Sequence, residues 1–297
     1  MELEDRFATE EACREYLSTL RWPAGFICPG CGGVKAWRMR KGLYLCARCR
    51  RQSSVTAGTI FQDSRVPLRL WLRAIWMVTS QKNGASALCL QRVLGLKSYK
   101  TVWAMLHKLR RAMVRPGRDR LTGRIEVDET YLGATDPGVV GRLTEEKALV
   151  IVAAQVEEDG TGRIRMSRIP NLERETLHGF IAQNIDPNST IVTDGLPAYA
   201  GMQGYVHEPQ TVARSGKRAS ELLPRVHLVI SLMKRWLMGT HHGAVRHSHL
   251  DYYLDEFVFR FNRRKSASRG KLFYRLVQQA VQVEPQPYHV LICHHDR

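Results

Sequence analysis

Four cysteines in the first fifty residues have the spacing of a metal site. They form two C-x₂-C pairs, Cys28–Cys31 and Cys46–Cys49, with fourteen residues between the pairs. Two thiolate pairs on tight turns can complete a tetrahedral Zn²⁺ shell, and this spacing is typical of a zinc ribbon with a β-hairpin over residues 34–45. The alternative, four unliganded core thiols, is disfavoured by the doubled motif. Because four cysteines leave no position for water, we expect the zinc to be structural.

Two aspartates could do a different kind of chemistry. Residues 125–128 alternate apolar and acidic, which puts Glu126 and Asp128 on one face of a predicted strand. Asp194 ends a second apolar strand, residues 190–193, just before Gly195. Carboxylates from neighbouring strands can hold Mg²⁺, and two metal ions can activate a water or a 3′-hydroxyl and stabilise the leaving oxygen. Either aspartate alone is more often structural, Asp194 as a turn former. Together, in a basic protein, they favour catalysis.

A predicted helix over residues 222–238, ending at Gly239, offers further groups. His227 and Lys234 are seven residues apart, two turns along one helical face. A neutral His227 could be a third metal ligand, and Lys234 could hold a phosphate as a point charge. The alternative for His227 is a half-buried histidine among apolar neighbours.

The positive charge is concentrated in the first two-fifths of the chain. The net charge is +17, and residues 1–118 carry 22 Lys/Arg against 7 Asp/Glu, a net of +15. Such a surface attracts a polyanion and releases its counterions. A solubilising face usually mixes signs, and a membrane surface is a poorer fit because no lipidation signal or amphipathic anchor accompanies the charge. Nucleic acid is the expected partner.

The segment at residues 67–115 reads as helices. Residues 86–94, a turn at Gly95 and residues 98–109 have the pattern of a helix-turn-helix, whose second helix enters the major groove. Lys97 and Lys100 lie where base contacts usually arise, and Arg263 and Arg264 belong to a later basic stretch suited to phosphates. The alternative is an ordinary three-helix bundle with a solvated face.

After residue 118 the pattern changes to alternating strands and helices. Strands are predicted over residues 124–132, 148–156, 162–168 and 190–193, and helices over 174–184 and 249–262. The expected organisation is an N-terminal helix (1–25), the zinc ribbon (26–60), a helical DNA-binding segment (61–118), a catalytic domain (119–275) and a tail (276–297). An acidic N-terminus without an apolar core, and no run of 18 apolar residues, predict a cytoplasmic protein.

Taken together, these motifs resemble the bacterial insertion-sequence transposases of the ISXO type. The resemblance covers nearly the whole chain. It rests on the two cysteine pairs and on Val127–Gly133, Thr193–Gly195 with Tyr199 and His207, Leu223–His227, Leu232–Arg235, Gly239–His242 and Tyr253–Arg264.

The resemblance implies an α+β, multidomain protein whose catalytic domain is RNase H-like, with a mixed sheet flanked by helices. Asp128 and Asp194 would be the first two metal-binding acids, on the first and fourth strands, holding Mg²⁺ or Mn²⁺. His227 stands where most relatives have Glu and some Asn. Lys234, with Arg235 beside it, would contact DNA.

The implied reaction is attack by water at the element's end, which frees a 3′-hydroxyl that then attacks target DNA. The ribbon and the helical segment would recognise terminal inverted repeats, with the enzyme acting as a dimer or larger assembly. Two alternatives remain open. One is a DNA-binding regulator whose second domain serves only oligomerisation, and the other is a structure-specific nuclease that cleaves without joining. A second zinc site at His241, His242, His247 and His249 has no supporting cysteine or pair spacing.

Overall fold

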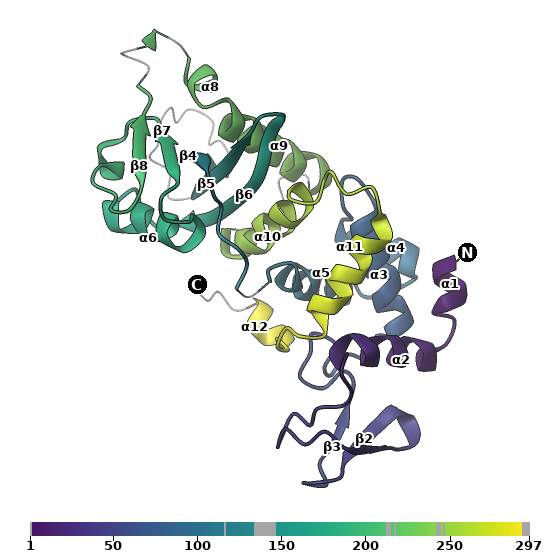
Figure 1. The fold of residues 1–297 in the computed structure, drawn as a ribbon. Helices are drawn as coiled ribbons and strands as arrows, with labels where there is room; N and C mark the ends of the chain where they lie inside the picture. The colour runs from purple at the N-terminus through teal and green to yellow at the C-terminus, as the bar shows by residue number, and fades with distance from the viewer. Residues whose placement is uncertain are drawn as a thin grey trace. The chain divides into compact units, whose positions relative to one another are not determined.

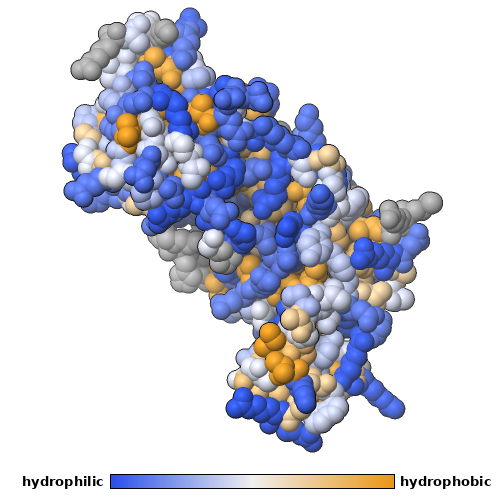
Figure 2. All heavy atoms as spheres, in the orientation of Figure 1, coloured by the Kyte–Doolittle hydropathy of each residue, from blue (hydrophilic) through white to orange (hydrophobic). Residues whose placement is uncertain are grey.

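The computed structural model describes residues 2–115, 117–133, 147–211, 215–216, 218–241, 245 and 247–292. The chain divides into two compact units: residues 1–115 with 266–297, and residues 116–265 (Figure 1). None of the helices in these ranges is long and apolar enough to cross a membrane. The face seen in Figure 2 is largely hydrophilic.

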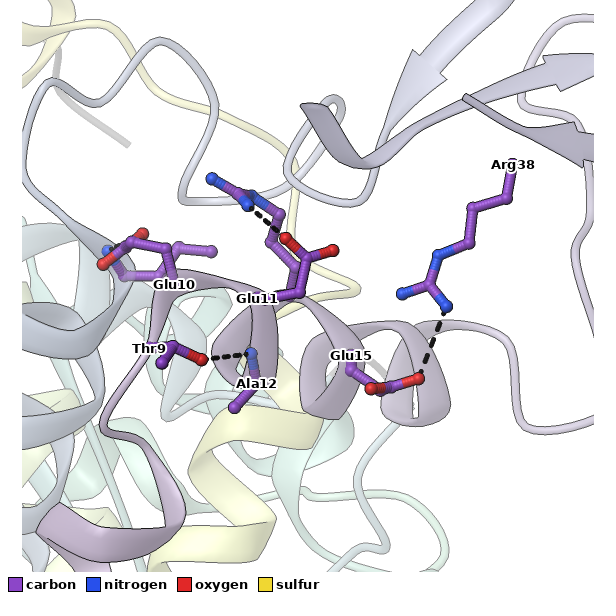
Figure 3. Close-up of polar contacts among 8 residues, drawn as sticks. Thr9, Glu10, Glu11, Ala12, Glu15 and Arg38 are labelled. Atoms are coloured by element: carbon purple, nitrogen blue, oxygen red, sulfur yellow. Dashed lines mark hydrogen bonds and ion pairs between the residues drawn. The ribbon is translucent and has the colours of Figure 1, made fainter. Parts of the chain in front are cut away.

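The first unit begins with two helices, α1 (Glu2–Arg6) and α2 (Glu10–Arg21), where the sequence predicted a single N-terminal helix within residues 1–25. The break has a local cause. Thr9 is extended and its hydroxyl accepts the N–H of Ala12 at 3.2 Å, so a new helix is capped there (Figure 3).

Three helices follow as predicted: α3 (Leu68–Ser80), α4 (Ala87–Leu94) and α5 (Tyr99–Ala112). The hydroxyls of Ser86 and Ser98 cap the second and third of them, and Gly95 takes the left-handed conformation, φ 65°, that ends α4. The two predicted helices and the glycine turn between them are therefore confirmed as secondary structure.

The C-terminal part of the chain returns to this first unit. Helix α11 (Arg269–Ala280) packs on α2, α3 and α5, and α12 (Tyr288–Ile292) follows it. Phe273 lies 6.0 Å from Phe7 and 6.3 Å from Tyr16 between ring centroids. The second unit ends at Lys265, ten residues before the boundary predicted at 275. A local apolar pattern identifies a helix but not the core in which it is buried.

The zinc ribbon is a small antiparallel sheet of β1 (Ala36–Arg38), β2 (Leu43–Cys46) and β3 (Gln52–Ser54). The first two strands form the predicted hairpin, with Trp37 opposite Leu45. Glu15 of α2 faces Arg38 of β1 at 3.4 Å (Figure 3). An exposed pair of this kind contributes little to stability.

The second unit is built on a five-stranded mixed sheet in the order β6-β5-β4-β7-β8 (Figure 1). The predicted strands are present as β4 (Arg124–Leu132), β5 (Ala148–Glu157), β6 (Gly160–Ile169) and β7 (Thr190–Thr193). The first three run antiparallel, and β4, β7 and β8 (Val206–Pro209) run parallel. The edge strand β8 was not predicted, because its four residues are partly or fully exposed and form no apolar run.

Helices cover both faces of this sheet (Figure 1). One core joins the sheet to α9 (Pro224–His241) and α10 (Leu250–Phe261), and the other joins it to α6 (Arg174–Asn184). A short helix, α8 (Ala219–Leu222), precedes α9. The predicted end at Gly239 was wrong: α9 continues through this residue to His241, and Gly239 is not among the glycines with positive φ.

Candidate metal centres and catalytic residues

The four predicted zinc ligands converge at the ribbon. Their ligand atoms all lie within 4.8 Å of one another, and the Sγ–Sγ distances are 3.6 Å for Cys28–Cys49 and for Cys31–Cys46. A tetrahedral ZnS₄ centre with Zn–S bonds of about 2.3 Å has S–S edges of about 3.8 Å. A disulfide would need about 2 Å. The site therefore fits a structural zinc ion.

The backbone around the cysteines favours thiolates. The N–H of Gly30 donates to Cys28 Sγ at 3.4 Å and lowers the pKa of that thiol to about 6. A Cβ atom at Gly33 would lie 3.3 Å from Cys46 Sγ and 3.4 Å from Cys31 Sγ. Glycine thus gives the sulfurs the space in which to gather.

Asp128 and Asp194 lie just past the last paired residues of two neighbouring parallel strands. The pairing of β4 with β7 ends at Glu126 and Val192, and each aspartate is two residues further along the chain. Asp128 lies within β4, with its side chain 14% exposed. Asp194 follows the end of β7, is exposed, and accepts the N–H of Leu196 at 3.0 Å.

Helix α9 brings two more predicted residues to Asp128. The Nε2 atom of His227 lies 3.5 Å from Asp128 Oδ2. Partial loss of water lowers the pKa of the Lys234 ammonium, and the charge of Asp128 opposes this shift, so the two groups are within electrostatic reach. Among the described residues, Asp128, Asp194 and His227 do not form a group as tight as the four cysteines.

Glu126 has a role that sequence reasoning did not assign. Its side chain is buried, at 5% exposure, and its Oε2 accepts the backbone N–H groups of Arg225 at 2.7 Å and Val226 at 2.9 Å. Burial raises the pKa of this carboxyl, and the two N–H donors oppose the shift. The alternation of β4 showed that Glu126 shares a face with Asp128, but its partners are about a hundred residues away and leave no local signal.

Two side-chain contacts connect the residues around Asp194 to neighbouring strands of the sheet. The hydroxyl of Tyr199, which is fully buried, donates to Glu129 Oε1 on β4. The Thr193 hydroxyl lies 3.0 Å from Nε2 of His207 on β8. Tyr199 and His207 were both part of the sequence resemblance, and these contacts give them a structural role beside Asp194.

The predicted DNA-contacting residues have different surroundings. Lys97, Lys100 and Arg235 are exposed, the first two around the start of α5. The Arg263 guanidinium stacks 4.1 Å from the ring of Phe259. Arg264 donates to the carbonyls of Gly162, Phe261 and Thr161. Its donors are therefore committed to joining the end of α10 to β6, which leaves fewer of them for a phosphate.

The histidines after α9 do not form a second metal group among the residues that the structure covers. His241 packs edge-on against Trp236 and Tyr253, at 4.7 and 4.8 Å between ring centroids. His242 lies outside the described residues.

Comparison with known proteins identifies both parts of the chain. Residues 120–262 match the model of the ISXO2-like transposase domain, and residues 8–52 match that of the transposase zinc-ribbon domain. An uncharacterized protein in the transposable element ISH50 of Halobacterium salinarum is 28% identical over 215 residues, which are 65% of this chain and 70% of that protein.

Two solved structures of Mos1 transposase show a distant similarity. The strand transfer complex is 12% identical with a TM-score of 0.27, over 71% of this chain and 75% of that one. The paired-end complex with the left transposon end is 9% identical with a TM-score of 0.25, over 72% and 79%. TM-scores this low do not establish a shared fold. The two domain matches identify a transposase zinc-ribbon domain followed by an ISXO2-like transposase domain, in agreement with the cysteine cluster and the mixed sheet.

Proposed function

We propose that this transposase cleaves DNA at the ends of its own element and joins them to a target, with Asp128, Asp194 and His227 holding divalent metal. The proposal depends on one observation: His227 Nε2 is 3.5 Å from Asp128 Oδ2, and Asp128 lies on the strand that pairs in parallel with β7, the strand just before Asp194. These groups come from three distant parts of the sequence.

The donor set fits a hard or borderline divalent cation. Two carboxylates suit Mg²⁺ and Mn²⁺, and an imidazole is better suited to Mn²⁺. The Oδ1 of Asp128 accepts the N–H of Glu129 at 2.9 Å, and its Oδ2 faces His227. When bound there, the metal would activate a water or a 3′-hydroxyl and stabilise the leaving oxygen.

The chemistry consists of two in-line phosphoryl transfers. In the first, a water oxygen bonds to phosphorus at the element's end and the P–O3′ bond breaks, which leaves a 3′-hydroxyl. In the second, that hydroxyl bonds to a target phosphorus and displaces another 3′-oxygen. Lys234, near Asp128, would hold a phosphate as a point charge.

The first unit would hold the DNA. It carries most of the excess positive charge of the chain, and Lys97 and Lys100 are exposed around the start of α5. We assign recognition of the terminal inverted repeats to this unit, zinc ribbon included. Pairing of two ends would require at least a dimer.

The deciding experiment incubates a duplex containing the element's end with Mn²⁺ or Mg²⁺ and compares wild type with Asp128→Asn. Loss of several kcal/mol of metal-dependent stabilisation predicts a fall in cleavage of about a thousandfold, while DNA affinity is retained. Because the amide is isosteric, an unchanged melting temperature serves as the folding control.

The two alternatives give different results in the same assay. A regulator would bind the duplex and produce no metal-dependent nicks. A nuclease would cut without joining and without preference for the element's end. Either result would contradict the proposal.

A further inference from the structure

Glu126 is a buried acid beside the proposed catalytic centre. It lies two residues before Asp128 on the same face of β4, and it pairs with Ala154 of β5 and Val192 of β7. Its side chain is only 5% exposed. A carboxylate on a central strand needs hydrogen-bond partners, because burying it unpaired is costly.

Those partners are the first free backbone donors of α9. The helix starts at Pro224, which has no N–H, after Leu223, whose apolar side chain cannot cap it. The next two N–H groups, of Arg225 and Val226, both donate to Glu126 Oε2. The next N–H group, of His227, donates instead to the backbone carbonyl of Leu223 at 3.2 Å, as in the regular hydrogen-bond pattern of a helix. Glu126 therefore does from a distant strand what an N-cap side chain does locally, and its charge favours the positive end of the helix.

This cap determines where His227 stands. His227 follows Val226 directly, and its imidazole faces Asp128, two residues from Glu126 on the same strand. Strand β4 thus contacts α9 twice: Glu126 binds the first N–H groups of the helix, and Asp128 faces the side chain of His227. We propose that Glu126 is a positioning residue: it fixes the distance between His227 and Asp128, and through it the binding of divalent metal. This inference rests on the proposed function for the identity of the ligands.

Glu126 is not itself placed as a ligand. Its Oε2 is directed at two N–H groups of α9, which occupy that oxygen. A glutamine in its place would keep a carbonyl oxygen for both N–H donors, whereas an alanine would keep none. A metal ligand or a required charge would be lost in both variants.

The first unit provides a matched control. Glu10 of α2 accepts the N–H groups of Leu68 at 3.0 Å and Arg69 at 3.1 Å, and so caps α3 from a distance as Glu126 caps α9. Helix α3 also starts after a residue, Pro67, that makes no side-chain cap. Glu10→Ala removes the same device without touching the second unit.

The test measures metal at His227 directly. The protein is labelled with ¹³C at the histidine rings, and Mn²⁺ is titrated while paramagnetic broadening of the His227 signal is followed. Removing a residue that orients a metal ligand typically weakens binding by about 10–100-fold. Glu126→Ala should raise the Mn²⁺ concentration for half-broadening by about tenfold or more. In Glu126→Gln this Mn²⁺ concentration should stay within about threefold of the wild-type value. In Glu10→Ala it should equal the wild-type value, although the melting temperature of this variant falls.

Several results would overturn the proposal. They are an unchanged titration in Glu126→Ala, an equal loss in Glu126→Gln, or no effect of Mn²⁺ on His227 in wild type. If Glu126→Ala does not fold, Glu126→Gln compared with Asp128→Asn still decides between positioning and ligation. Cleavage is assayed in parallel. A wild type that binds Mn²⁺ at His227 but cuts no DNA contradicts the proposed function, while the positioning proposal still stands on the titration.

Discussion

At the scale of single residues, His227 should set the metal preference of the catalytic centre. Mg²⁺ prefers oxygen ligands, while Mn²⁺ tolerates an imidazole. His227 occupies the place next to Asp128 where the resemblance leads us to expect glutamate in most relatives. We predict that wild type cleaves several-fold faster with Mn²⁺ than with Mg²⁺, and that His227→Glu reduces or reverses this ratio.

The measurement is the ratio of initial cleavage rates in the two metals, with DNA affinity as a check that binding is intact. His227→Ala serves as the control, because it removes the imidazole without supplying an oxygen and should be slow in both metals. If His227→Ala cleaves as fast as wild type, His227 is a neighbour of the site and not a ligand.

Gly195 is the residue that lets the chain turn immediately after Asp194. Its φ is +87°, and an added Cβ would lie 2.5 Å from Thr211 Cγ2. Gly204, in the same unit, has φ +80° but open space around it. We expect Gly204→Ala to lower the free energy of unfolding by about 1 kcal/mol through backbone strain alone. Gly195→Ala should lower the free energy of unfolding by more than this. The rate of DNA cleavage should fall as well, because the clash shifts the loop that carries Asp194.

Chemical denaturation of the two alanine variants measures the difference, and the cleavage assay shows whether it reaches the site. Equal losses of stability, or a Gly195→Ala variant that cleaves normally, would show that the turn adapts without moving Asp194.

At the scale of elements, the ribbon should depend on its metal. Its three strands have only three or four residues each, and only Cys46 and Ser53 among them are buried, so the sheet is too small to be stable alone. Zinc supplies folding free energy in such sites. Removal of zinc by a chelator should abolish amide protection in β1–β3 and leave β4, β5 and β7 protected. Hydrogen exchange measures both regions in one sample, and loss of protection throughout the chain would contradict independent folding of the two units.

The same site should release zinc on acidification. The pKa of the Cys28 thiol is lowered to about 6 by the N–H of Gly30. A group whose pKa is lower in the folded than in the unfolded protein stabilises the folded form at pH values above its unfolded-state pKa. This stabilisation is lost as the pH falls through its folded-state pKa. We therefore expect zinc to be retained at pH 7 and released on acidification, because protons compete with the metal for the thiolates; a zinc-binding dye follows the release. Release that is complete at pH 7 would contradict this prediction.

The elements that sequence predicted well are those with a strong local pattern. The strands β4 and β7 match their predicted bounds, and Ser86, Gly95 and Ser98 mark helix ends by local hydrogen bonds or backbone conformation. The cysteine cluster was visible for the same reason. The edge strand β8 and the return of α11 to the first unit were missed, because exposure and long-range packing override local patterns.

The proposed catalytic centre, too, could be predicted from the sequence only where the signal was local. Alternation along β4 indicated the face of Asp128, and the spacing of His227 and Lys234 put both on one side of α9. Nothing local indicated that Glu126 caps that helix or that Tyr199 binds Glu129, since these contacts join residues 70 to 100 positions apart. Groups that bind metal have recognisable types, whereas groups that hold them in place can be any residue with the right reach.

At the scale of the whole molecule, the uneven charge makes a measurable prediction. Neutralising a phosphate releases condensed counterions, so the logarithm of the affinity falls with the logarithm of salt concentration by about 0.9 per phosphate contact. Lys97 and Lys100 are exposed around the start of α5. If each contacts one phosphate, the double variant Lys97→Ala/Lys100→Ala should reduce this slope by about 1.8.

A loss of positive charge elsewhere in the protein shows whether the salt dependence of DNA binding reflects direct phosphate contacts or only the net charge of the protein. Arg124 lies at the start of β4, and its guanidinium is paired with Glu208 at 2.8 Å. Arg124→Gln removes a positive charge that is already compensated and partly exposed, so the salt slope should not change. If it falls as much per charge removed as in the lysine double variant, the protein is responding to total charge. Assignment of the first unit as the DNA-holding part would then lose its support. A reduced slope in the lysine variant alone would assign contact to the start of α5.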